Sequence, residues 1–269
     1  MHPLRFGILL IASLGTMACV PDAVVWDGEI HRRGGALADS QRLVWTADDA
    51  IPTFIAAWEP EVWPSEPGAC VTSLRATPAL DGEAFASWFA VRPDSSVWLR
   101  VARSGDGGVT WNPAVTADSM DRGRTGCSRP APFIAADSLN GYVHVVYHLV
   151  AKEGAGVFFT HSMERGALFH EPVPIVYGDR PSAASVASRG DTVVVAYEDP
   201  NSRLPRLGLA ISRTEGHIFE RRVAASDETG EARTPRVAVR GTRLAIAWTV
   251  TQRGGGMPRT SIRLGTLVW

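Results

Sequence analysis

Arginine is the residue type whose placement in this sequence most clearly suggests binding chemistry. One arginine stands shortly before each of four proline-containing segments that recur along the chain, namely Arg75, Arg129, Arg180 and Arg233. A guanidinium group donates parallel hydrogen bonds that fit a carboxylate or a phosphate, so several of them around one opening would bind an anionic ligand. Alternatively, these arginines pair with acidic residues close in sequence, for which the candidates are Asp121, Asp179 and Glu231.

These arginines mark the starts of a repeated unit. Each unit begins at a proline, runs to a tight turn that contains glycine, and returns in a strand that ends in an aromatic residue. The four segments are 77–88, 129–147, 180–197 and 234–248. Their returning strands are rich in β-branched and aromatic residues, as strands buried between packed layers are. Turns such as Asp81-Gly82 and Asn140-Gly141 supply the positive φ angles that hairpins require.

Each unit continues beyond this hairpin. Third strands are expected over 96–103, 156–161, 207–212 and 261–269. Three of them lead into a shared pattern: a serine, a polar residue two positions on, a glycine four on and an aromatic residue seven on. The pattern occurs at Ser104–Trp111, Ser162–Phe169 and Ser212–Phe219, and fourth strands follow at 113–117, 171–177 and 221–225. Four strands in a unit of about 50 residues are typical of a β-propeller blade.

The first copy of this pattern resembles a known motif. Ser104–Trp111 matches the Asp box, Ser-x-Asp-x-Gly-x-Thr-Trp, of the sialidase (neuraminidase) superfamily, in which the bacterial neuraminidase repeat, or BNR repeat, closes into a six-bladed propeller. The resemblance covers about residues 73 to 269. In that family the boxes lie on the face away from the active site. The resemblance therefore implies structural roles for Ser104, Asp106, Gly108, Thr110 and Trp111.

The sequence predicts an all-β, sialidase-like propeller of four-stranded blades. Five blades are expected, with four or six as alternatives, because the chain is short for six repeats of this period. We divide it into a signal peptide (1–18), an N-terminal tether and possible ring-closing strand (19–40), and the propeller (41–269). The last unit stops after its third strand, so an N-terminal strand should complete it. The candidates are Val24–Trp26 and Arg42–Thr46, with Thr53–Trp58 in the first blade.

The resemblance also implies what catalysis would need. Sialidases hold the substrate carboxylate with three arginines, and they use a tyrosine nucleophile activated by a glutamate together with an aspartate acid–base. Tyr197 and Glu198 are the candidates for the tyrosine–glutamate pair. The alternative is that Tyr147 and Tyr197 pack between blades, because tryptophans hold the same place in the other two repeats. The Arg-Ile-Pro motif of the family is missing near the first blade.

Composition excludes several partners and cofactors. The 27 basic and 28 acidic residues give a net charge of -1, so no basic field would recruit nucleic acid. No Cys-x-x-Cys pair is present, and the histidines show no His-x-x-x-His spacing beside acidic partners, so no metal site is predicted from local spacing, and no cofactor is expected.

The N-terminus predicts export. Arg5 precedes an apolar run from Phe6 to Leu14, and small residues then lead to Cys19, which is the pattern of a secretory signal peptide. Thr16–Cys19 resembles a bacterial lipobox, which implies that Cys19 is lipidated and anchors the chain to a membrane, in the periplasm or at the cell surface. The alternative is cleavage after Ala18, which would leave a secreted protein.

Cys70 and Cys127 remain once Cys19 is set aside. Because disulfides persist outside the cytoplasm, we predict that these two are bonded, the alternative being two separately buried thiols.

These features together favour a non-catalytic binding or scaffold module whose partner is an anionic carbohydrate or a protein. An exo-sialidase-type glycoside hydrolase is the alternative, and the sequence does not separate a binding module from an assembly or adhesion protein. Trp58 and Trp63 would either stack on a sugar or cap the first blade.

Overall fold

The sheets of this protein are built from strands that follow one another along the chain. The computed structural model describes residues 22–46, 49–123, 125–226, 230–252 and 254–269. These residues form eighteen β-strands and two short 3-10 turns, η1 (Val71–Ser73) and η2 (Leu80–Gly82), and no α-helix lies among them. No helix of the described residues is long and apolar enough to cross a membrane.

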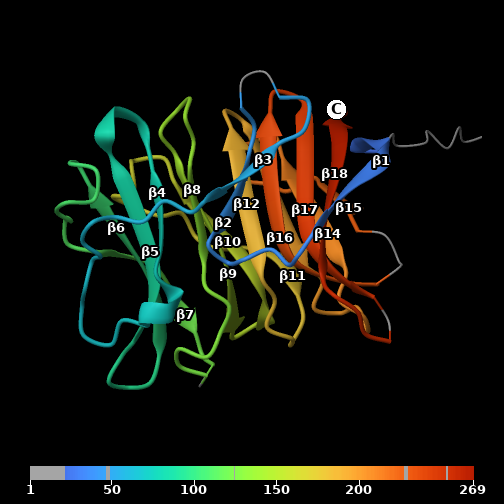
Figure 1. Ribbon diagram of the computed structural model, residues 1–269. Coiled ribbons are helices and arrows are strands. Elements are labelled where there is room, and N and C mark those ends of the chain that lie inside the picture. The colour runs from blue at the N-terminus through green and yellow to red at the C-terminus, as the bar shows by residue number, and fades with distance from the viewer. Residues whose placement is uncertain (1–21, 47–48, 124, 227–229, 253) are drawn as a thin grey trace, which may run out of the picture.

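Four sheets contain four antiparallel strands each (Figure 1). The first sheet contains β4 (Arg75–Pro78), β5 (Ala84–Val91), β6 (Val97–Ser104) and β7 (Val115–Asp121). The second sheet contains β8 (Phe133–Ala136), β9 (Val143–Ala151), β10 (Gly154–Ser162) and β11 (Val173–Tyr177). The third sheet contains β12 (Ala184–Arg189), β13 (Thr192–Glu198), β14 (Leu207–Ser212) and β15 (Arg221–Ala224). The fourth sheet contains β16 (Gly230–Arg240), β17 (Arg243–Gln252), β18 (Arg259–Leu267) and β1 (Val24–Gly34).

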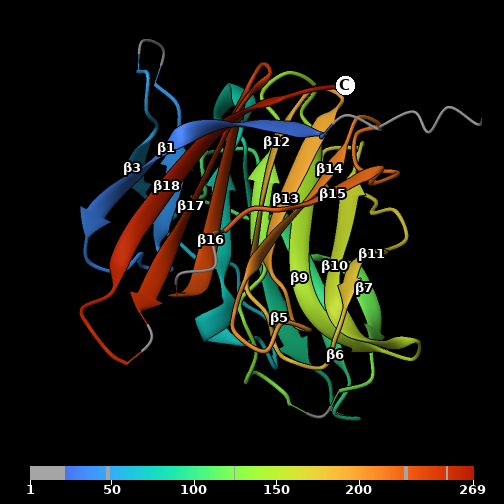
Figure 2. The ribbon, with the colours of Figure 1, turned by 90° about the vertical axis from the view of Figure 1, so that its right-hand side faces the viewer.

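The fourth sheet joins the two ends of the chain. β1 pairs with β18, from Val24 opposite Leu267 to Gly34 opposite Arg259 (Figure 2). Val24–Trp26 is therefore the segment that completes the last unit. The other candidate segment forms β2 (Gln41–Val44), which pairs with β3 (Thr53–Ala56) in a separate two-stranded sheet. The fourth sheet thus includes β1, which lies in the segment 19–40 that the sequence predicts as a tether and possible ring-closing strand.

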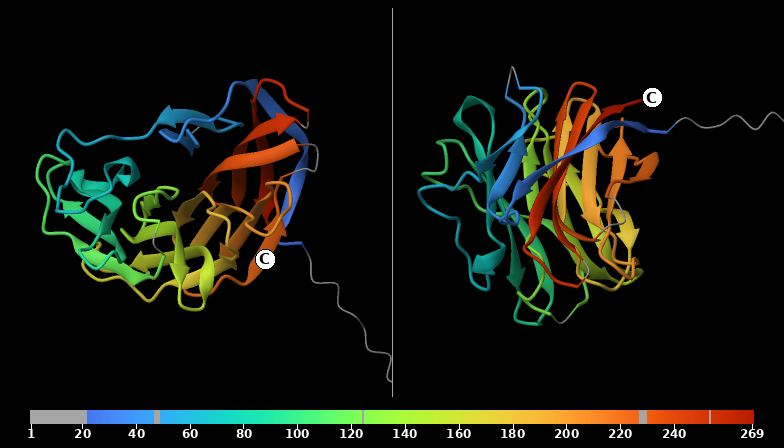
Figure 3. Two further views of the ribbon diagram at one scale, coloured as in Figure 1. Left: turned by 90° about the horizontal axis from the view of Figure 1, so that it is seen from below. Right: turned by 45° about the vertical axis from the view of Figure 1, so that its right-hand side comes forward.

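The first strands of the sheets lie around a common axis. β4 contacts β8, β8 contacts β12, and β12 contacts β16, and β2 contacts β16. The Arg42 side chain of β2 donates to the Ala76 carbonyl of β4, so the β2–β3 hairpin lies between the fourth sheet and the first. Figure 3 (left) shows the four sheets and this hairpin around the axis. This arrangement fits a β-propeller.

Burial explains why the second strand of each sheet is so apolar. β5, β9, β13 and β17 are buried on both faces for most of their length because each lies between neighbouring layers. The apolar clusters lie between consecutive sheets, and each contains side chains from both. The aromatic residues that end these strands are buried, namely Trp88, Tyr147, Tyr197 and Trp248. The two tyrosines therefore pack within the apolar clusters of the fold.

The Asp box is a network of hydrogen bonds that closes a turn. The Asp106 carboxylate accepts the Thr110 N–H at 2.8 Å and the Thr110 hydroxyl at 2.6 Å. The Ser104 hydroxyl donates to Asp106 at 2.7 Å and accepts the Gly108 N–H at 2.8 Å. These bonds hold the pKa of Asp106 down at about 2, with the Thr110 hydroxyl as the largest cause. The box side chains are used in turn formation.

The two degenerate copies keep the serine–glycine part of this network. The Ser162 hydroxyl accepts the Gly166 N–H at 2.9 Å, and the Ser212 hydroxyl accepts the Gly216 N–H at 3.1 Å. Each box glycine has a positive φ and packs closely on an aromatic ring of the preceding unit. The pairs are Gly108 with Trp58, Gly166 with Phe85, and Gly216 with Phe159. The box therefore also forms contacts between units.

A disulfide joins Cys70 to Cys127. Cys70 lies in the segment before β4 and Cys127 in the segment before β8, so the bond links the loops that lead into the first and second sheets. Cys19 and the signal peptide lie outside the described residues.

Candidate functional site: the central channel

Two arginines and a phenylalanine divide the channel around the common axis of the sheets. Phe133 lies at the start of β8, and the guanidinium carbons of Arg42 and Arg236 lie 5.2 and 5.7 Å from its ring centroid. Guanidinium groups at such distances are attracted to the face of an aromatic ring. Because the three residues come from β2, β8 and β16, they connect three parts of the ring.

Both arginines also bind backbone carbonyl groups of the surrounding strands. Arg42 donates to the carbonyls of Ala76 at 2.8 Å and Ile134 at 2.9 Å. Arg236 donates to the carbonyls of Gln41 at 2.6 Å and Pro235 at 2.8 Å. It also reaches the carbonyls of Ala38 and Asp39. These two side chains tie the inner strands together across the axis.

The channel carries an excess of positive charge. Burial, together with the neighbouring Arg236, lowers the pKa of Arg42 to about 10. Burial likewise lowers the pKa of Arg236 to about 10, where Arg75 adds to the effect while Asp39 and Glu198 oppose it. Both arginines remain protonated near neutral pH. The one carboxylate that forms an ion pair with Arg236 is Asp39, at 3.7 Å and largely exposed, among the residues whose placement is described.

The loop-side mouth is the end of the channel where the loops leading into β4, β8, β12 and β16 converge. Its cavity has a volume of about 60 Å³ and is lined by residues that include Asp39, Arg75, Phe133 and Arg236. Arg75 donates through Nη1 to the carbonyls of Leu74 and Thr72. A cavity of this size accepts one or two water molecules and is far below the several hundred Å³ of ligand pockets.

The Asp-box-side mouth is the opposite end, beside the hairpin turns and the Asp boxes. Its cavity has a volume of about 390 Å³, within the range of small-molecule sites. Arg42 reaches it from the centre of the channel, and Arg189 and Arg240 contribute to its lining at the ends of β12 and β16. Arg240 also packs over the Trp45 ring. Arg189 is exposed, and its side chain forms no hydrogen bond or ion pair within the described part of the chain. The walls are aliphatic side chains of the inner strands, including Leu43, Val186, Val237 and Val239.

The arginines singled out from the sequence do not gather at one opening. Arg129 forms a buried ion pair with Asp121, one of its acidic neighbours in sequence, and it packs over the Phe89 ring. Arg180 donates to the carbonyls of Asp199 and Ser202. Arg233 pairs with Glu231 at 3.3 Å and lies 4.0 Å from Glu198. Only Arg75 lines the channel.

Tyr197 and Glu198 point to opposite sides of their sheet. They are neighbours on β13, and successive side chains of a strand alternate between its faces. Glu198 accepts the Thr234 N–H at 2.8 Å, on the side of the fourth sheet, and burial raises the pKa of its carboxyl group. Tyr197 packs in the cluster between the second and third sheets. The two side chains therefore do not form a nucleophile and its base with each other.

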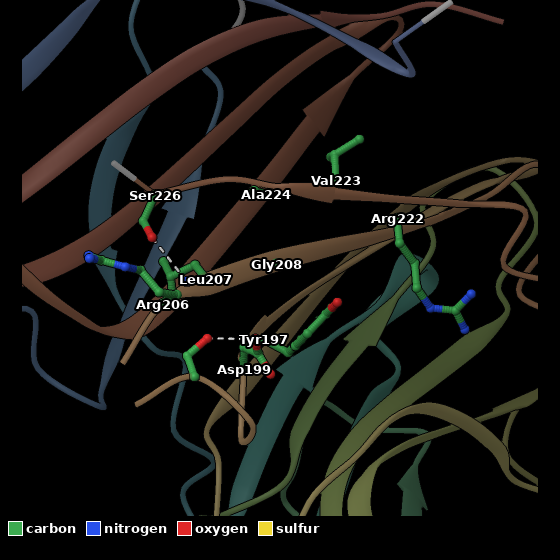
Figure 4. A pocket seen from close by; sticks show the side chains of 10 residues that line it. Tyr197, Asp199, Arg206, Leu207, Gly208, Arg222, Val223, Ala224 and Ser226 are labelled. Carbon is green, nitrogen blue, oxygen red and sulfur yellow. Dashed lines mark hydrogen bonds between the residues drawn. The ribbon is translucent and has the colours of Figure 1, made fainter. Parts of the chain in front are cut away.

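Tyr197 lines a different hollow, on the side of the third sheet (Figure 4). This hollow has a volume of about 370 Å³ and also contains Arg206 and Arg222. The Tyr197 ring lies over Gly208, where a Cβ atom would come within 2.5 Å of the hydroxyl oxygen. Burial is the largest cause of the raised pKa of Tyr197, and Asp199 adds to it. The phenol is thus held in its neutral form, which is a poor nucleophile.

Trp58 and Trp63 lie outside the channel. Trp58 packs on Gly108 of the Asp box, so it covers the first sheet. Trp63 lines a hollow with Trp88 and Trp111, and the Trp111 indole donates to the Val62 carbonyl at 2.6 Å.

Sequence reasoning missed Arg42 and Arg236. The arginines that recur in the sequence stand before each proline, whereas Arg236 follows Pro235. Arg42 lies in the N-terminal segment, which is not one of the four repeated units. The only signal in the sequence is an arginine on a strand that is otherwise apolar, as in Arg42-Leu43-Val44-Trp45.

Comparisons with known proteins bear on the fold. No protein-family model matches the chain, and no curated protein matches it. Among solved structures, a protein of unknown function from Dyadobacter fermentans matches with a TM-score of 0.53 and 14% identity, over 72% of this chain and 52% of that one. The endosialidase of phage phi92 matches with a TM-score of 0.52 and 10% identity, over 70% of this chain and 34% of that one.

The chain has a sialidase-like fold. A Hadza microbial sialidase also matches, with a TM-score of 0.47 and 16% identity, over 69% of this chain and 45% of that one. The matched part of the chain spans about half the length of the Dyadobacter protein and of the Hadza sialidase.

Proposed function

We propose that this chain is an exported, lipid-anchored, sialidase-like propeller of five blades that binds an anionic glycan without cleaving it. Four blades are the four-stranded sheets, and the fifth is the β2–β3 hairpin, which lies between the first sheet and the fourth. The ligand site is the Asp-box-side mouth. The observation that carries this proposal is a cavity of about 390 Å³ at the end of a channel with excess positive charge.

The charge and shape of this mouth suit a sugar acid. Arg189 is exposed at its rim, so its guanidinium group is available to a carboxylate. The positive charge of Arg42 would attract the same group, although its donors already bind backbone carbonyls. The aliphatic walls provide surface for the apolar faces of a pyranose ring.

A binding role without catalysis agrees with the tyrosines. The Tyr147 hydroxyl is held by Asp118, and Tyr197 is separated from Glu198 by the thickness of the sheet. Neither phenol lines the channel cavities. Hydrolysis of a sialoside would require a nucleophile beside the bound sugar.

The test of this proposal is binding of sugar acids to the purified chain. Isothermal titration with sialyl and glucuronyl oligosaccharides should show binding that weakens about tenfold or more in Arg189→Ala, since the lost charge-assisted hydrogen bonds contribute about 1.5–3 kcal/mol. Arg259→Ala is the matched control, because Arg259 is an exposed arginine on β18, away from the cavity, and its loss should leave binding unchanged. Equal effects of the two substitutions would argue against this site.

A parallel assay separates binding from catalysis. The chain is incubated with a fluorogenic sialoside and the release of fluorophore is followed. We expect no turnover above that of the buffer. Turnover that survives purification would favour the alternative, an exo-sialidase-type hydrolase.

The anchor is tested separately in cells. Metabolic labelling with an alkyne fatty acid should label the protein, and Cys19→Ala should abolish the label. Export is also supported by the Cys70–Cys127 disulfide, since such bonds persist outside the cytoplasm. Release of an unlabelled wild-type chain into the medium would contradict the anchor.

A further inference from the structure

Three histidines from two sheets meet on the Asp-box side of the molecule. His161 is the last residue but one of β10, His170 directly follows the Asp-box copy of the second sheet, and His217 lies within the copy of the third. Each offers one ring nitrogen, and these nitrogens all lie within 4.8 Å of one another. His161 and His170 flank the Asp-box copy of the second sheet, where the His170 N–H donates to the His161 carbonyl at 2.9 Å. His217 joins them through packing of the third sheet against the second.

The three rings pack directly against one another. The His161 ring stacks on His170 with centroids 4.4 Å apart, and it meets His217 edge to face at 4.6 Å. The rings of His170 and His217 are nearly perpendicular, with centroids 5.1 Å apart. Three imidazole nitrogens within 4.8 Å of one another are a ligand set of the kind that transition-metal ions bind.

Hydrogen bonding prepares one of these rings for coordination. His217 Nδ1 lies 2.7 Å from the Thr214 carbonyl, and because a carbonyl oxygen only accepts, Nδ1 carries the proton. The lone pair of the neutral ring is therefore on Nε2. A histidine that ligates a metal through one nitrogen usually donates the other N–H to a carbonyl or a carboxylate, which fixes the ring orientation.

The buried member of the cluster has an unused nitrogen. His161 is 2% exposed, and its Nε2 has no hydrogen-bond partner. A buried polar atom without a partner costs free energy, so such atoms are rare in folded proteins unless an ion or a water molecule binds there.

We propose that His161, His170 and His217 bind one divalent transition-metal ion, Zn²⁺, between the second and third sheets. The ion would cross-link two Asp-box loops and keep a fourth coordination position open to solvent, because His170 and His217 are exposed. Zinc–nitrogen bonds of 2.0–2.1 Å place tetrahedral ligands roughly 3.4 Å apart. The two exposed side chains can close the remaining distance by small rotations.

Metal titration of the full chain, prepared without a polyhistidine tag and stripped with EDTA, tests the proposal. Zn²⁺ should bind with a stoichiometry of one in isothermal titration and should raise the unfolding temperature. Co²⁺ should give visible d–d absorption bands that Zn²⁺ displaces. His170→Ala and His217→Ala should each weaken binding by roughly 100-fold or more, since even loss of a supporting hydrogen bond costs 10- to 100-fold.

Matched variants keep the result interpretable. His31→Ala removes a histidine of β1 outside the cluster and should bind Zn²⁺ like the wild type. In EDTA, the unfolding temperatures of His170→Ala and His217→Ala should match that of the wild type, because both side chains are exposed. A folded wild-type chain that binds no Zn²⁺, or binding that persists in the His170→Ala/His217→Ala double variant, would overturn the proposal.

Discussion

Tyr147 donates its hydroxyl to the buried Asp118 carboxylate at 2.6 Å, across the boundary between the first and second sheets. Asp118 lies on β7 and Tyr147 on β9. Burial raises the pKa of Asp118, while the hydrogen bonds from Tyr147 and from the Met120 N–H work in the opposite direction. The contact therefore contains a carboxylate whose ionisation the folded state disfavours.

This relationship predicts a pH dependence of stability. The pKa of Asp118 is higher in the folded state than its ordinary value of 3.8. The protonated carboxyl group therefore contributes fully to the free energy of unfolding below pH 3.8, and this contribution is lost as the pH rises through the raised pKa. Asp118→Asn keeps the shape of the side chain but has no charge, and its single oxygen replaces only one of the two carboxylate oxygens that accept from the Met120 N–H and the Tyr147 hydroxyl. Calorimetry of both chains between pH 3.5 and 7.5 should show the unfolding temperature of the variant gaining on that of the wild type as pH rises. Parallel curves would contradict this account of the carboxylate.

Removal of the hydroxyl should destabilise the protein. Tyr147→Phe leaves Asp118 buried without its side-chain donor, and we expect a loss of about 1–3 kcal/mol of unfolding free energy. Tyr142→Phe is the matched control, since Tyr142 is only half-buried and its hydroxyl has no hydrogen bond to a described residue. Its effect in urea titration should be close to zero. A comparable loss in both variants would show that the hydrogen bond is not the cause.

The Asp-box glycines predict a second kind of instability. At Gly216, with φ of +95°, a Cβ atom would lie 2.4 Å from the Phe159 ring, so Gly216→Ala combines backbone strain with a clash. We expect a loss of about 3 kcal/mol, from about 1 kcal/mol for the backbone and the rest for overpacking. Gly241→Ala isolates the backbone part, because Gly241 also has a positive φ but no atom within 4 Å of a Cβ. Urea unfolding of the two variants should differ by about 2 kcal/mol, and equal losses would exclude the ring contact.

Local patterns in the sequence were sufficient for most of the fold. Strand positions followed from the spacing of prolines, turn glycines and aromatic residues, because these residues set local backbone conformation. The need for β1 followed from the missing fourth strand of the last unit. The Asp box was informative for the same reason, since Ser104, Asp106 and Thr110 bond to one another within a few residues.

The candidate site was less predictable because its contacts are long-range. Arg129 has its acidic partner eight residues away, and that pairing was among the alternatives. Arg236 instead binds carbonyls of residues 38 to 41, and Arg42 binds those of β4 and β8. The spacing of residues in the sequence does not predict these carbonyl partners, because the pairing depends on how the sheets pack around their common axis. The approach of His217 to His161 and His170 has the same origin.

The disulfide predicts a redox-dependent stability. Cys70 and Cys127 are 57 residues apart, and closing a loop of that length stabilises the fold by about 4 kcal/mol on the chain-entropy estimate. Urea unfolding with and without dithiothreitol should show a large shift of the midpoint for the wild type. The Cys70→Ala/Cys127→Ala variant should match the reduced wild type and not respond to dithiothreitol. A response in that variant would point to another effect of the reductant.

Replacing the two channel arginines Arg236 and Arg75 should lower the free energy of unfolding by different amounts. Arg236 is 4% exposed and donates to backbone carbonyls from Ala38 to Gln41, so Arg236→Met leaves buried acceptors without partners. We expect a loss of about 3 kcal/mol in chemical denaturation. Arg75→Met removes a half-buried arginine that donates to two carbonyls of its own loop, and it should cost about 1 kcal/mol or less. If Arg236→Met proved as mild as Arg75→Met, Arg236 would not be holding β16 to the N-terminal segment, and its positive charge would be available for ligand binding instead.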